Sequence, residues 1–484
     1  MTSLEISKLM PLIIVLLTPM VAMLVIAIKR NHFATMFLSL IGLLIALAWI
    51  PATRLIPVTR IGTMLTIDNY ALFYFSLIFL AAIFIIVPSY AYLEKRFAGN
   101  KEEYYLLIVT ATLGSVVLAA SSHFATFFLG LEILSVSLYT LIAYLRHTNE
   151  GIEAAIKYLI LAAASSAFLV FGMALVYSQT GTMAFSGVMQ HLAQAANYNL
   201  ILVAGIAMMV VGFGFKMALV PFHMWSPDVY QGAPAPVSAF IASVSKGGIL
   251  ALLFRFFVQY DIVHSKPLFI IFATLAVLSM FGGNFLALMQ TNVKRLLAYS
   301  SIAHFGYILV AFMAGNHNPN FTGAGAATFY IVSYFVTIIG AFIIVGVFSN
   351  KEREAFARSD YKGMYWKHPW LSIAFSAMLF SLAGIPLTAG FVGKYYVLAA
   401  GIGNGLWWLV IILIINSALG VYYYLRIIVE MFSSSEEDKQ RTAAPVKVSL
   451  ATGFVLALLT IALIWLGVYP TGIIAAIKAS ALVF

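Results

Sequence analysis

The amino-acid sequence predicts an all-α polytopic membrane protein, and three of its features support that class. Hydrophobic residues make up 63% of the 484 residues and charged residues only 9%, whereas soluble domains are typically about half apolar and a quarter charged. So few charges cannot cover a water-facing surface. The apolar residues gather in runs of about 20, which is the length that a bilayer-spanning helix needs. The chain has no cysteine, which excludes disulfides, thiolate metal sites and iron–sulfur clusters.

Apolar runs bounded by charge, proline or glycine predict about 14 transmembrane helices. The predicted spans are 9–28, 33–50, 70–93, 104–121, 122–145, 153–178, 199–222, 234–258, 267–289, 296–315, 324–348, 369–401, 405–432 and 448–469. The first run is preceded by Lys8 and has no small-residue cleavage site, so we expect a retained span and not a signal peptide. The loops between the spans are short, and no soluble catalytic domain is expected.

Proline interrupts two of the predicted helices, Pro221 the seventh and Pro386 the twelfth. The two helices lie five spans apart, and five is odd, so helices 4–8 and 9–13 are expected to form two inverted five-helix repeats. Inverted repeats with broken helices in matching positions are typical of transporters, and the breaks mark the site. This divides the chain into 1–103 (three N-terminal helices), 104–258 (first repeat), 267–432 (second repeat) and 433–484 (helix 14 and tail).

The distribution of positive charge predicts the orientation in the membrane. The net charge is +10, a surplus that in a soluble chain could indicate nucleic acid binding. Here the loops after odd-numbered spans hold 16 cations. The opposite side holds five, namely Lys8, Arg54, Arg60, Lys266 and Lys478. The positive-inside rule therefore places the odd loops in the cytoplasm and both termini outside.

Four ionisable residues lie at mid-membrane depth, where a charge is costly and indicates function or pairing. Glu132 lies in the fifth span, Lys216 five residues before Pro221, Lys246 in the middle of the eighth span, and Lys394 eight residues after Pro386. The different distances from the two prolines are not explained by the sequence. Because the lysines outnumber the carboxylate, pairing cannot neutralise them all. Burial lowers the pKa of a lysine and a nearby carboxylate raises it. A carboxylate whose influence shifts between lysines would therefore load and unload protons, which indicates proton conduction.

Three further residues are weaker candidates for proton transfer. Lys157 follows Glu153 by four residues, which is also the ordinary spacing of a helix-stabilising pair. His223 and His304 could relay protons near neutral pH, although a lone membrane histidine is as often a satisfied polar residue. The residues near span ends that we expect to snorkel towards water are Arg255, Arg426 and Glu430.

Three stretches of the chain resemble the antiporter-like membrane subunits of respiratory complex I. They are VPFHMWSPDVYQGAPAPVSAFIASVSK (220–246), TNVKRLLAYSSIAHFGY (291–307) and SLAGIPLTAGFVGKYYV (381–397). The resemblance covers essentially the whole chain. Within this family, the QGAPAP run and a lysine at 394 are typical of one bacterial subunit type. Other types are expected to carry an EGPTPVS-like run, a glutamate on the twelfth helix, or a long lateral helix after the last span.

The resemblance implies roles for the four central residues. Glu132 matches the carboxylate that modulates Lys216, Lys216 matches the lysine of the broken seventh helix, Lys246 the central lysine, and Lys394 the lysine at the exit side. Protons would enter near Lys216 and leave through Lys394. The alternatives are a subunit of a multisubunit cation/proton antiporter with the same fold, or a scaffold whose polar residues only hold helices together.

The resemblance also implies partners, cofactors and location. The chain itself would bind no cofactor, while other subunits would use FMN, iron–sulfur clusters, NADH and a quinone. Expected partners are other membrane subunits of complex I, including antiporter-like neighbours and small helical subunits, and membrane lipid, with no nucleic acid. The expected location is the inner membrane of a bacterium, with both termini on the periplasmic side.

Overall fold

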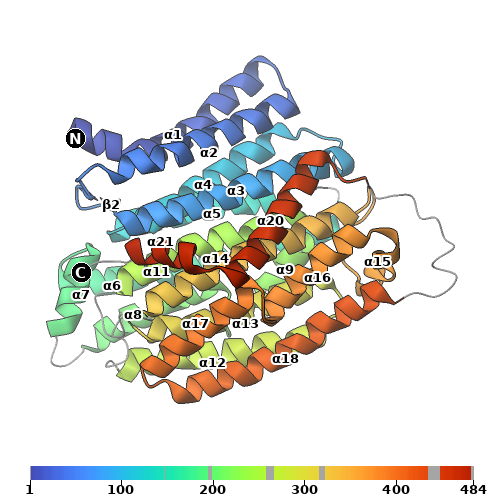
Figure 1. Ribbon diagram of the computed structural model, residues 1–484. Coiled ribbons are helices and arrows are strands. Elements are labelled where there is room, and N and C mark those ends of the chain that lie inside the picture. The colour runs from blue at the N-terminus through green and yellow to red at the C-terminus, as the bar shows by residue number, and fades with distance from the viewer. Residues whose placement is uncertain are drawn as a thin grey trace.

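A computed structural model describes residues 2–146, 148–194, 199–257, 266–315, 322–433 and 447–480. The described chain is a bundle of long helices that run side by side across the molecule (Figure 1). The only strands among these residues are β1 (Arg60–Ile61) and β2 (Leu65–Thr66), which pair as a short antiparallel hairpin. The prediction of an all-α membrane fold is confirmed.

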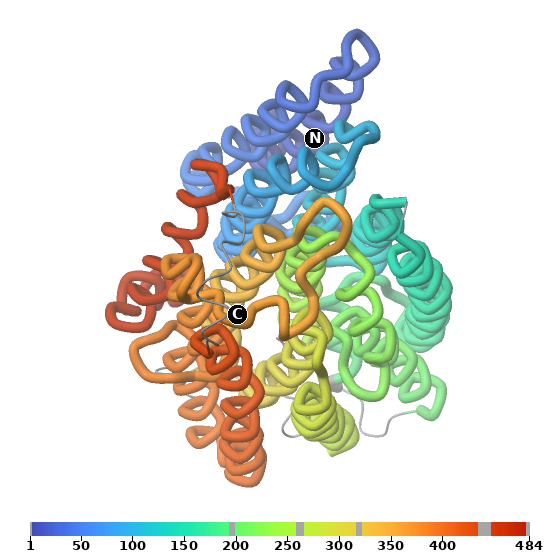
Figure 2. Tube along the Cα trace, turned by 90° about the vertical axis from the view of Figure 1, so that its right-hand side faces the viewer, coloured from blue at the N-terminus to red at the C-terminus, as the bar shows by residue number. Residues whose placement is uncertain are grey.

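The three N-terminal helices form one edge of the bundle, drawn in blue (Figures 1 and 2). They are α1 (Ser3–Ile28), α2 (His32–Arg54) and α3 (Asn69–Arg96). Each begins where a polar side chain accepts a hydrogen bond from the first turn, namely Thr2, Asn31 and Asp68. Such caps satisfy backbone N–H groups that a helix start leaves without partners.

The next part of the chain contains the first interrupted helix. Its elements are α4 (Glu102–Ala120), α5 (Phe124–Ile142), α6 (Asn149–Thr180), α7 (Phe185–Gln194), α8 (Leu200–Met217), α9 (Trp225–Gly232), α10 (Ala235–Phe240), the π-helical turn η1 (Ile241–Ser245) and α11 (Lys246–Phe257). The predicted seventh span, 199–222, corresponds to α8, and the chain continues past the break at Pro221 into α9. The short helix α7 lies in a stretch that we expected to be a loop.

The last part contains the second interrupted helix. Its elements are α12 (Lys266–Leu288), α13 (Val293–Met313), α14 (Gly323–Phe348), the 3-10 turn η2 (Arg358–Tyr361), α15 (Met364–Lys367), α16 (Pro369–Ala383), α17 (Ala389–Gly403), α18 (Trp407–Phe432), α20 (Leu450–Val468) and α21 (Thr471–Ala479). The predicted twelfth span thus consists of α16 and α17, with the break at 384–388.

Thirteen helices of the described residues are long and apolar enough to cross a membrane. They coincide with all the predicted spans except the twelfth, whose halves are shorter. Equivalent pairs pack together in the two halves: α4 with α5 and α12 with α13, α6 with α8 and α14 with α16. The two inverted repeats remain a prediction, and this shared pairing supports it.

The centre of the bundle is formed by the segments that carry two of the predicted sites. The apolar windows of 235–257 and 293–313 are entirely buried, whereas those of α1 and α2 are mostly exposed. Lys246 and His304 therefore belong to the inner helices and not to a surface that lipid covers.

Glycine allows α4 and α5 to pack closely. A Cβ atom at Gly114 would lie 2.6 Å from the backbone nitrogen of Leu134 and 2.8 Å from the carbonyl oxygen of Gly130. These are backbone atoms and cannot rotate away. Small residues at helix contacts are a common means of association in membranes, where van der Waals packing dominates.

We predict that Gly114→Ala destabilises the protein by about 1–3 kcal/mol, the usual cost of overpacking. The matched control is Gly453→Ala on α20, where the added Cβ would meet only a Val448 methyl group at 3.9 Å. The measurement is the thermal unfolding midpoint of the purified membrane assembly. Equal midpoints for the two variants would contradict the close α4–α5 contact.

Candidate functional site

The first break lies between α8 and α9. The last residue of α8 is Met217, and Ala218 takes a left-handed backbone conformation with φ of 58°. The amide of Leu219 then donates to the carbonyl of Gly214 at 2.8 Å, which closes the helix end. The indole N–H of Trp225, the first residue of α9, donates to the Phe215 carbonyl at 2.9 Å. The interruption is thus internally satisfied, as a break at membrane depth requires.

Lys216 lies in the last turn of α8 and is buried. Its Nζ donates to Ser135 Oγ on α5 at 2.7 Å. Glu132 lies one turn earlier on α5, where its carboxylate accepts a hydrogen bond from Ser166 Oγ of α6 at 2.8 Å. No direct ion pair joins these two described residues. Any Coulomb interaction between this carboxylate and the ammonium therefore crosses the low-dielectric interior and involves no direct contact.

Lys246 is the first residue after the π-helical turn η1 and is fully buried. Its Nζ donates to Ser301 Oγ on α13 at 2.7 Å and lies 4.5 Å from the centroid of the Phe305 ring. Single π-helical turns inside α-helices occur frequently at functional sites. Among the described residues, no carboxylate contacts this ammonium, so a neutral hydroxyl and an aromatic face are its direct polar neighbours.

Lys394 belongs to α17 and reaches back across the second break. Its Nζ donates to the carbonyls of Leu382 (3.1 Å) and Ala383 (2.8 Å) and to Ser417 Oγ (2.8 Å). The two carbonyls form the end of α16, where the helix dipole favours a cation. Gly384 follows with φ of 83°, and a Cβ there would lie 2.8 Å from the Lys394 side chain.

The two lysines also differ in where their ammonium groups bind relative to the breaks. Lys216 stands in the last turn of the first half-helix of its pair. Lys394 stands on the second half-helix, but its ammonium binds the last carbonyls of the first half, α16. The Lys216 ammonium, in contrast, donates to Ser135 on the neighbouring helix α5, so of the two lysines it is Lys394 that binds the carbonyl end of a half-helix.

One face of α13 carries contacts to both Lys246 and Lys394. Ser301 accepts from Lys246, and the Tyr307 ring centroid lies 5.5 Å from Lys394 Nζ. His304 stands midway between them at the same helical spacing. Its ring nitrogens contact the hydroxyls of Tyr330 (2.6 Å) and Tyr424 (3.2 Å).

A small cavity continues from His304 to the second break. Its volume is about 10 Å³, and its lining includes Tyr334, Ser381 and Leu382. A polar cavity of about that size holds roughly one water. The cavity thus adjoins the carbonyl of Leu382 to which Lys394 donates.

Two of the three weaker candidates, Lys157 and His223, lie apart from these central contacts. The predicted pair of Lys157 and Glu153 is present at 2.7 Å, but Lys157 also binds Asp228 at 2.8 Å, and its side chain is partly exposed. Burial alone would raise the pKa of the Asp228 carboxyl, but Lys157 and Arg295 hold it below its ordinary value. Within the described part of the chain, His223 forms no hydrogen bond to the lysines.

Two residues that we expected to snorkel are paired instead. Arg255 is buried and forms two hydrogen bonds to the carboxylate of Asp68, at 2.9 and 2.7 Å. Glu430 pairs with Arg358. Sequence reasoning missed these pairs because their partners lie far away along the chain.

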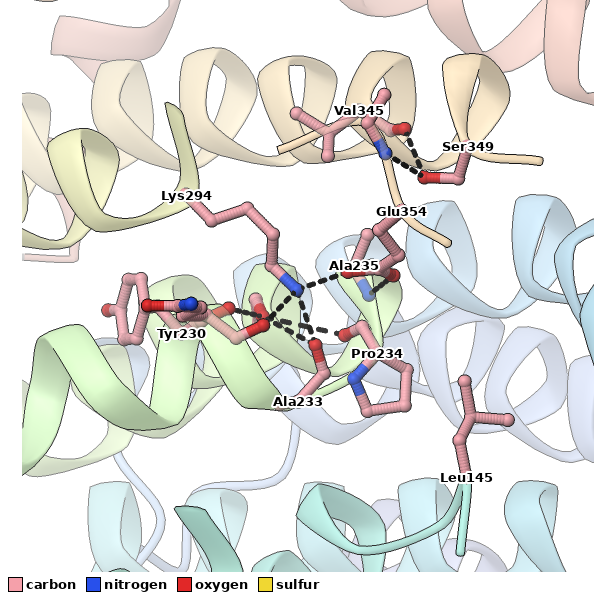
Figure 3. Close-up of polar contacts among 12 residues, drawn as sticks. Leu145, Tyr230, Ala233, Pro234, Ala235, Lys294, Val345, Ser349 and Glu354 are labelled. Carbon is pink, nitrogen blue, oxygen red and sulfur yellow. Dashed lines mark hydrogen bonds and ion pairs between the residues drawn. The ribbon is translucent and has the colours of Figure 1, made fainter. Parts of the chain in front are cut away.

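A buried ion pair that the sequence did not indicate joins the two halves of the protein (Figure 3). Lys294, which we expected among the loop cations, is fully buried at the start of α13. Its Nζ donates to the carbonyls of Gln231 (3.0 Å) and Ala233 at the end of α9, and to the carboxylate of Glu354. The only signal was the position of this lysine beside the apolar run of the tenth span.

The carboxylate of Glu354 also contacts helices from the first half of the chain. Its carboxylate accepts from the amide of Ala235, the first residue of α10, at 2.9 Å, and from the hydroxyl of Tyr92 on α3. Burial would raise the pKa of this carboxyl, but the Lys294 ammonium and its hydrogen bonds lower it below the usual value. The cation thus lies at the carbonyl end of one helix and the anion at the amide end of the next, as helix dipoles favour.

A bundle with two interrupted helices and buried lysines at both breaks and between them defines an antiporter-like membrane protein. The family model described as NADH:quinone oxidoreductase/Mrp antiporter, transmembrane part, matches residues 121–420. NADH-quinone oxidoreductase subunit N of Ectopseudomonas mendocina is 43% identical over 413 residues, which are 84% of this chain and 82% of that protein. Subunit N of Methylococcus capsulatus is 42% identical over 407 residues, with the same shares covered.

A solved structure has the same fold over nearly the whole chain. A chain of respiratory complex I from Thermus thermophilus superposes with a TM-score of 0.82 at 31% identity, covering 97% of this chain and 100% of that one. The chain therefore belongs to the antiporter-like membrane subunits of NADH:quinone oxidoreductase. Both curated relatives are of the N type, which is the type that the QGAPAP run and Lys394 indicated, so that prediction is confirmed.

We predict that Glu354→Ala prevents stable assembly or lowers stability by about 3–5 kcal/mol, because it leaves the Lys294 ammonium buried without its carboxylate. Glu354→Gln keeps an acceptor for the Ala235 amide and should be milder. The control is Glu352→Ala, an exposed carboxylate in the same loop. The measurement is the yield and thermal midpoint of the purified assembly, and equal values for Glu354→Ala and the control would refute a stabilising role.

Proposed function

We propose that this chain is a proton-translocating subunit without a redox centre, working inside a bacterial NADH:quinone oxidoreductase. The observation that carries the proposal is that the three buried lysines have neutral partners and no carboxylate in contact with them. Lys216, Lys246 and Lys394 each donate to a serine hydroxyl, and none of them contacts a carboxylate among the described residues. An ammonium held by neutral acceptors can give up its proton without leaving an unpaired buried anion, which suits transfer.

The proposed order of transfer runs along the chain of contacts. Protons enter beside Lys216, whose charge Glu132 modulates from the neighbouring helix, and pass to Lys246. From there they move along the face of α13, with His304 between the lysines, to Lys394. Lys157 and His223 lie outside this chain of contacts. In this proposal they take no part in transfer between the lysines and could only help protons to reach Lys216.

Partners, cofactors and orientation belong to the same proposal. The relatives are named as subunits of an oxidoreductase, so we infer that FMN, iron–sulfur clusters, NADH and a quinone are handled by other subunits. Other antiporter-like and small helical subunits, and lipid, would cover the outward-facing apolar helices. The charge asymmetry supports cytoplasmic odd loops, periplasmic termini and a bacterial inner membrane.

The main alternative is a subunit of a multisubunit cation/proton antiporter, since the matching family model covers both kinds of protein. The identity to the N-type relatives favours the oxidoreductase. Cation transport by the chain in liposomes, lost without a sodium or potassium gradient, would favour the alternative. A scaffold role predicts that lysine-to-methionine changes lower assembly and leave the activity of the assembled enzyme intact.

We predict that Lys216→Ala, reconstituted in the complex, lowers proton pumping coupled to quinone reduction by roughly tenfold or more, within the range that a positioned acid–base group contributes. Glu132→Gln should impair pumping, and Glu132→Asp should be milder. Lys478→Ala, which removes an exposed lysine at the bundle surface, is the control. Wild-type pumping and quinone reduction in Lys216→Ala would exclude the role of Lys216.

We predict that removing the hydroxyl that holds Lys246 also slows proton pumping. Ser301→Ala removes a hydrogen bond to a charged group, worth about 1.5–3 kcal/mol, and should slow pumping by roughly tenfold. Ser39→Ala on α2 is the matched control, because that buried hydroxyl donates within its own helix, to the Thr35 carbonyl. The readout is the initial rate of proton uptake by proteoliposomes, and identical rates for both variants would argue against a role for Ser301.

A further inference from the structure

A second polar site lies at the end of the bundle that carries the N-terminus, apart from the lysines described above. A cavity of about 730 Å³ lies between α1, α2, the β1–β2 hairpin, α3, α7 and the end of α11. These elements meet at the left-hand side of the bundle, near the label of β2 (Figure 1). The volume falls in the range of ligand sites, which is roughly 300–1,000 Å³.

The lining of this cavity is strongly cationic. Four cations line it, Lys8, Arg54, Arg60 and Arg255, and Asp68 is the one carboxylate among the lining residues. Asp68 is fully engaged by Arg255 through two hydrogen bonds. Burial would raise the pKa of the Asp68 carboxyl, but Arg255 keeps it below its usual value, so this pair stays ionised and neutral as a unit.

The other three cations have no carboxylate partner among the described residues. Lys8 is 2% exposed, and its Nζ donates to the carbonyls of Thr53 and Ile56, both at 3.0 Å. Arg54 and Arg60 are exposed, and the described chain offers their guanidinium groups no partner. A buried ammonium and two free guanidinium groups that line one cavity create a positive field that attracts an anion. Guanidinium groups suit phosphate oxygens in particular, because they can donate two parallel hydrogen bonds.

The rim of the cavity is held in place by the surrounding turns. The amide of Ser122 and the hydroxyl of Thr126 both donate to the carbonyl of Met64, at 3.1 and 2.8 Å. These bonds fix the β1–β2 hairpin to the turn between α4 and α5. Arg60, on β1, is therefore presented by an ordered element, as a binding site requires.

Apolar side chains beside the arginines indicate the source of the anion. Leu55, next to Arg54, is 85% exposed. Large apolar side chains also face outward along α1 and α2: Leu16, Met20, Leu24, Phe37 and Leu44. A free phosphate ion has no apolar part to contact such a surface, whereas the acyl chains of a phospholipid can pack against it.

We propose that this cavity binds a phosphate group, and that the headgroup of an anionic phospholipid supplies it while the acyl chains lie along α1 and α2. Arg54 and Arg60 would contact the phosphate oxygens, with Lys8 behind them. The proposal does not depend on proton transfer through the lysines, so its failure would leave the proposed function untouched.

The test is photo-cross-linking of the purified, lipid-depleted complex with photoactivatable phosphatidylglycerol, followed by mass spectrometry of the peptides that span residues 54–66. We expect labelling of this segment, reduced roughly 25-fold by Arg54→Gln/Arg60→Gln, since each cation near a lipid surface contributes about a factor of five. The control is Lys266→Gln/Lys478→Gln, which removes two exposed cations from the same end of the bundle. This control variant should be labelled to the same extent as the unmodified protein.

Two comparison arms separate the sources of the anion. Photoactivatable phosphatidylethanolamine, which has no net charge, should label the segment weakly. Loss of phosphatidylglycerol labelling in millimolar inorganic phosphate would support the anion site but assign it to free phosphate. The proposal would be overturned if phosphatidylglycerol did not label the segment, or if it labelled Arg54→Gln/Arg60→Gln as strongly as the unmodified protein. Because both arginines are exposed and without partners, the double variant should fold, and its assembly yield checks this.

Discussion

The buried pair of Lys294 and Glu354 is the interaction on which the central architecture depends. It fills the gap between α9 and α10, where the chain turns through the QGAPAP run and two helix ends face each other. A carbonyl end and an amide end both leave backbone groups without partners, and here a cation satisfies one and an anion the other. Because Lys294 begins α13 and Glu354 comes from the loop after α14, the same pair ties the second half of the chain to the first.

The position of the central lysine follows from this arrangement. Once the ion pair fixes the start of α10, the helix runs through η1 directly to Lys246. Helix α13 runs from Lys294 to Ser301, whose hydroxyl accepts a hydrogen bond from Lys246. A buried ion pair is seldom a net gain in stability, since removing two charges from water costs several kcal/mol per ion. Its value here is geometric, because it sets the register in which an ammonium on one buried helix meets a hydroxyl on another.

The sequence predicted the helices and the lysines well because both produce strong local signals. An apolar run of about 20 residues rarely forms anything but a membrane span, and a single cation within it is visible without knowledge of its neighbours. The partners could not be predicted in the same way. Nothing in the sequence distinguishes the three serines that bind the lysines, Ser135, Ser301 and Ser417, from other serines. They become partners only because the fold brings the ammonium groups of α8, α11 and α17 to them. Helix α7 was missed because it is short and amphipathic, and Lys294 was counted as a loop cation because its burial depends on the fold of distant residues.

The spacing along α13 sets a physical requirement on any proton path between the last two lysines. Ser301 and Tyr307 are six residues apart, which is about 9 Å along a helix at 1.5 Å per residue. Direct transfer needs heavy atoms within about 3 Å, so an intermediate group is required. His304 occupies the middle of this interval with tyrosine hydroxyls on both ring nitrogens, and the small polar cavity beside it reaches the carbonyl end of α16. Since α13 is buried throughout and packed on all sides, side-chain rotation and water, and not movement of the helix, are the steps left to carry a proton across this interval.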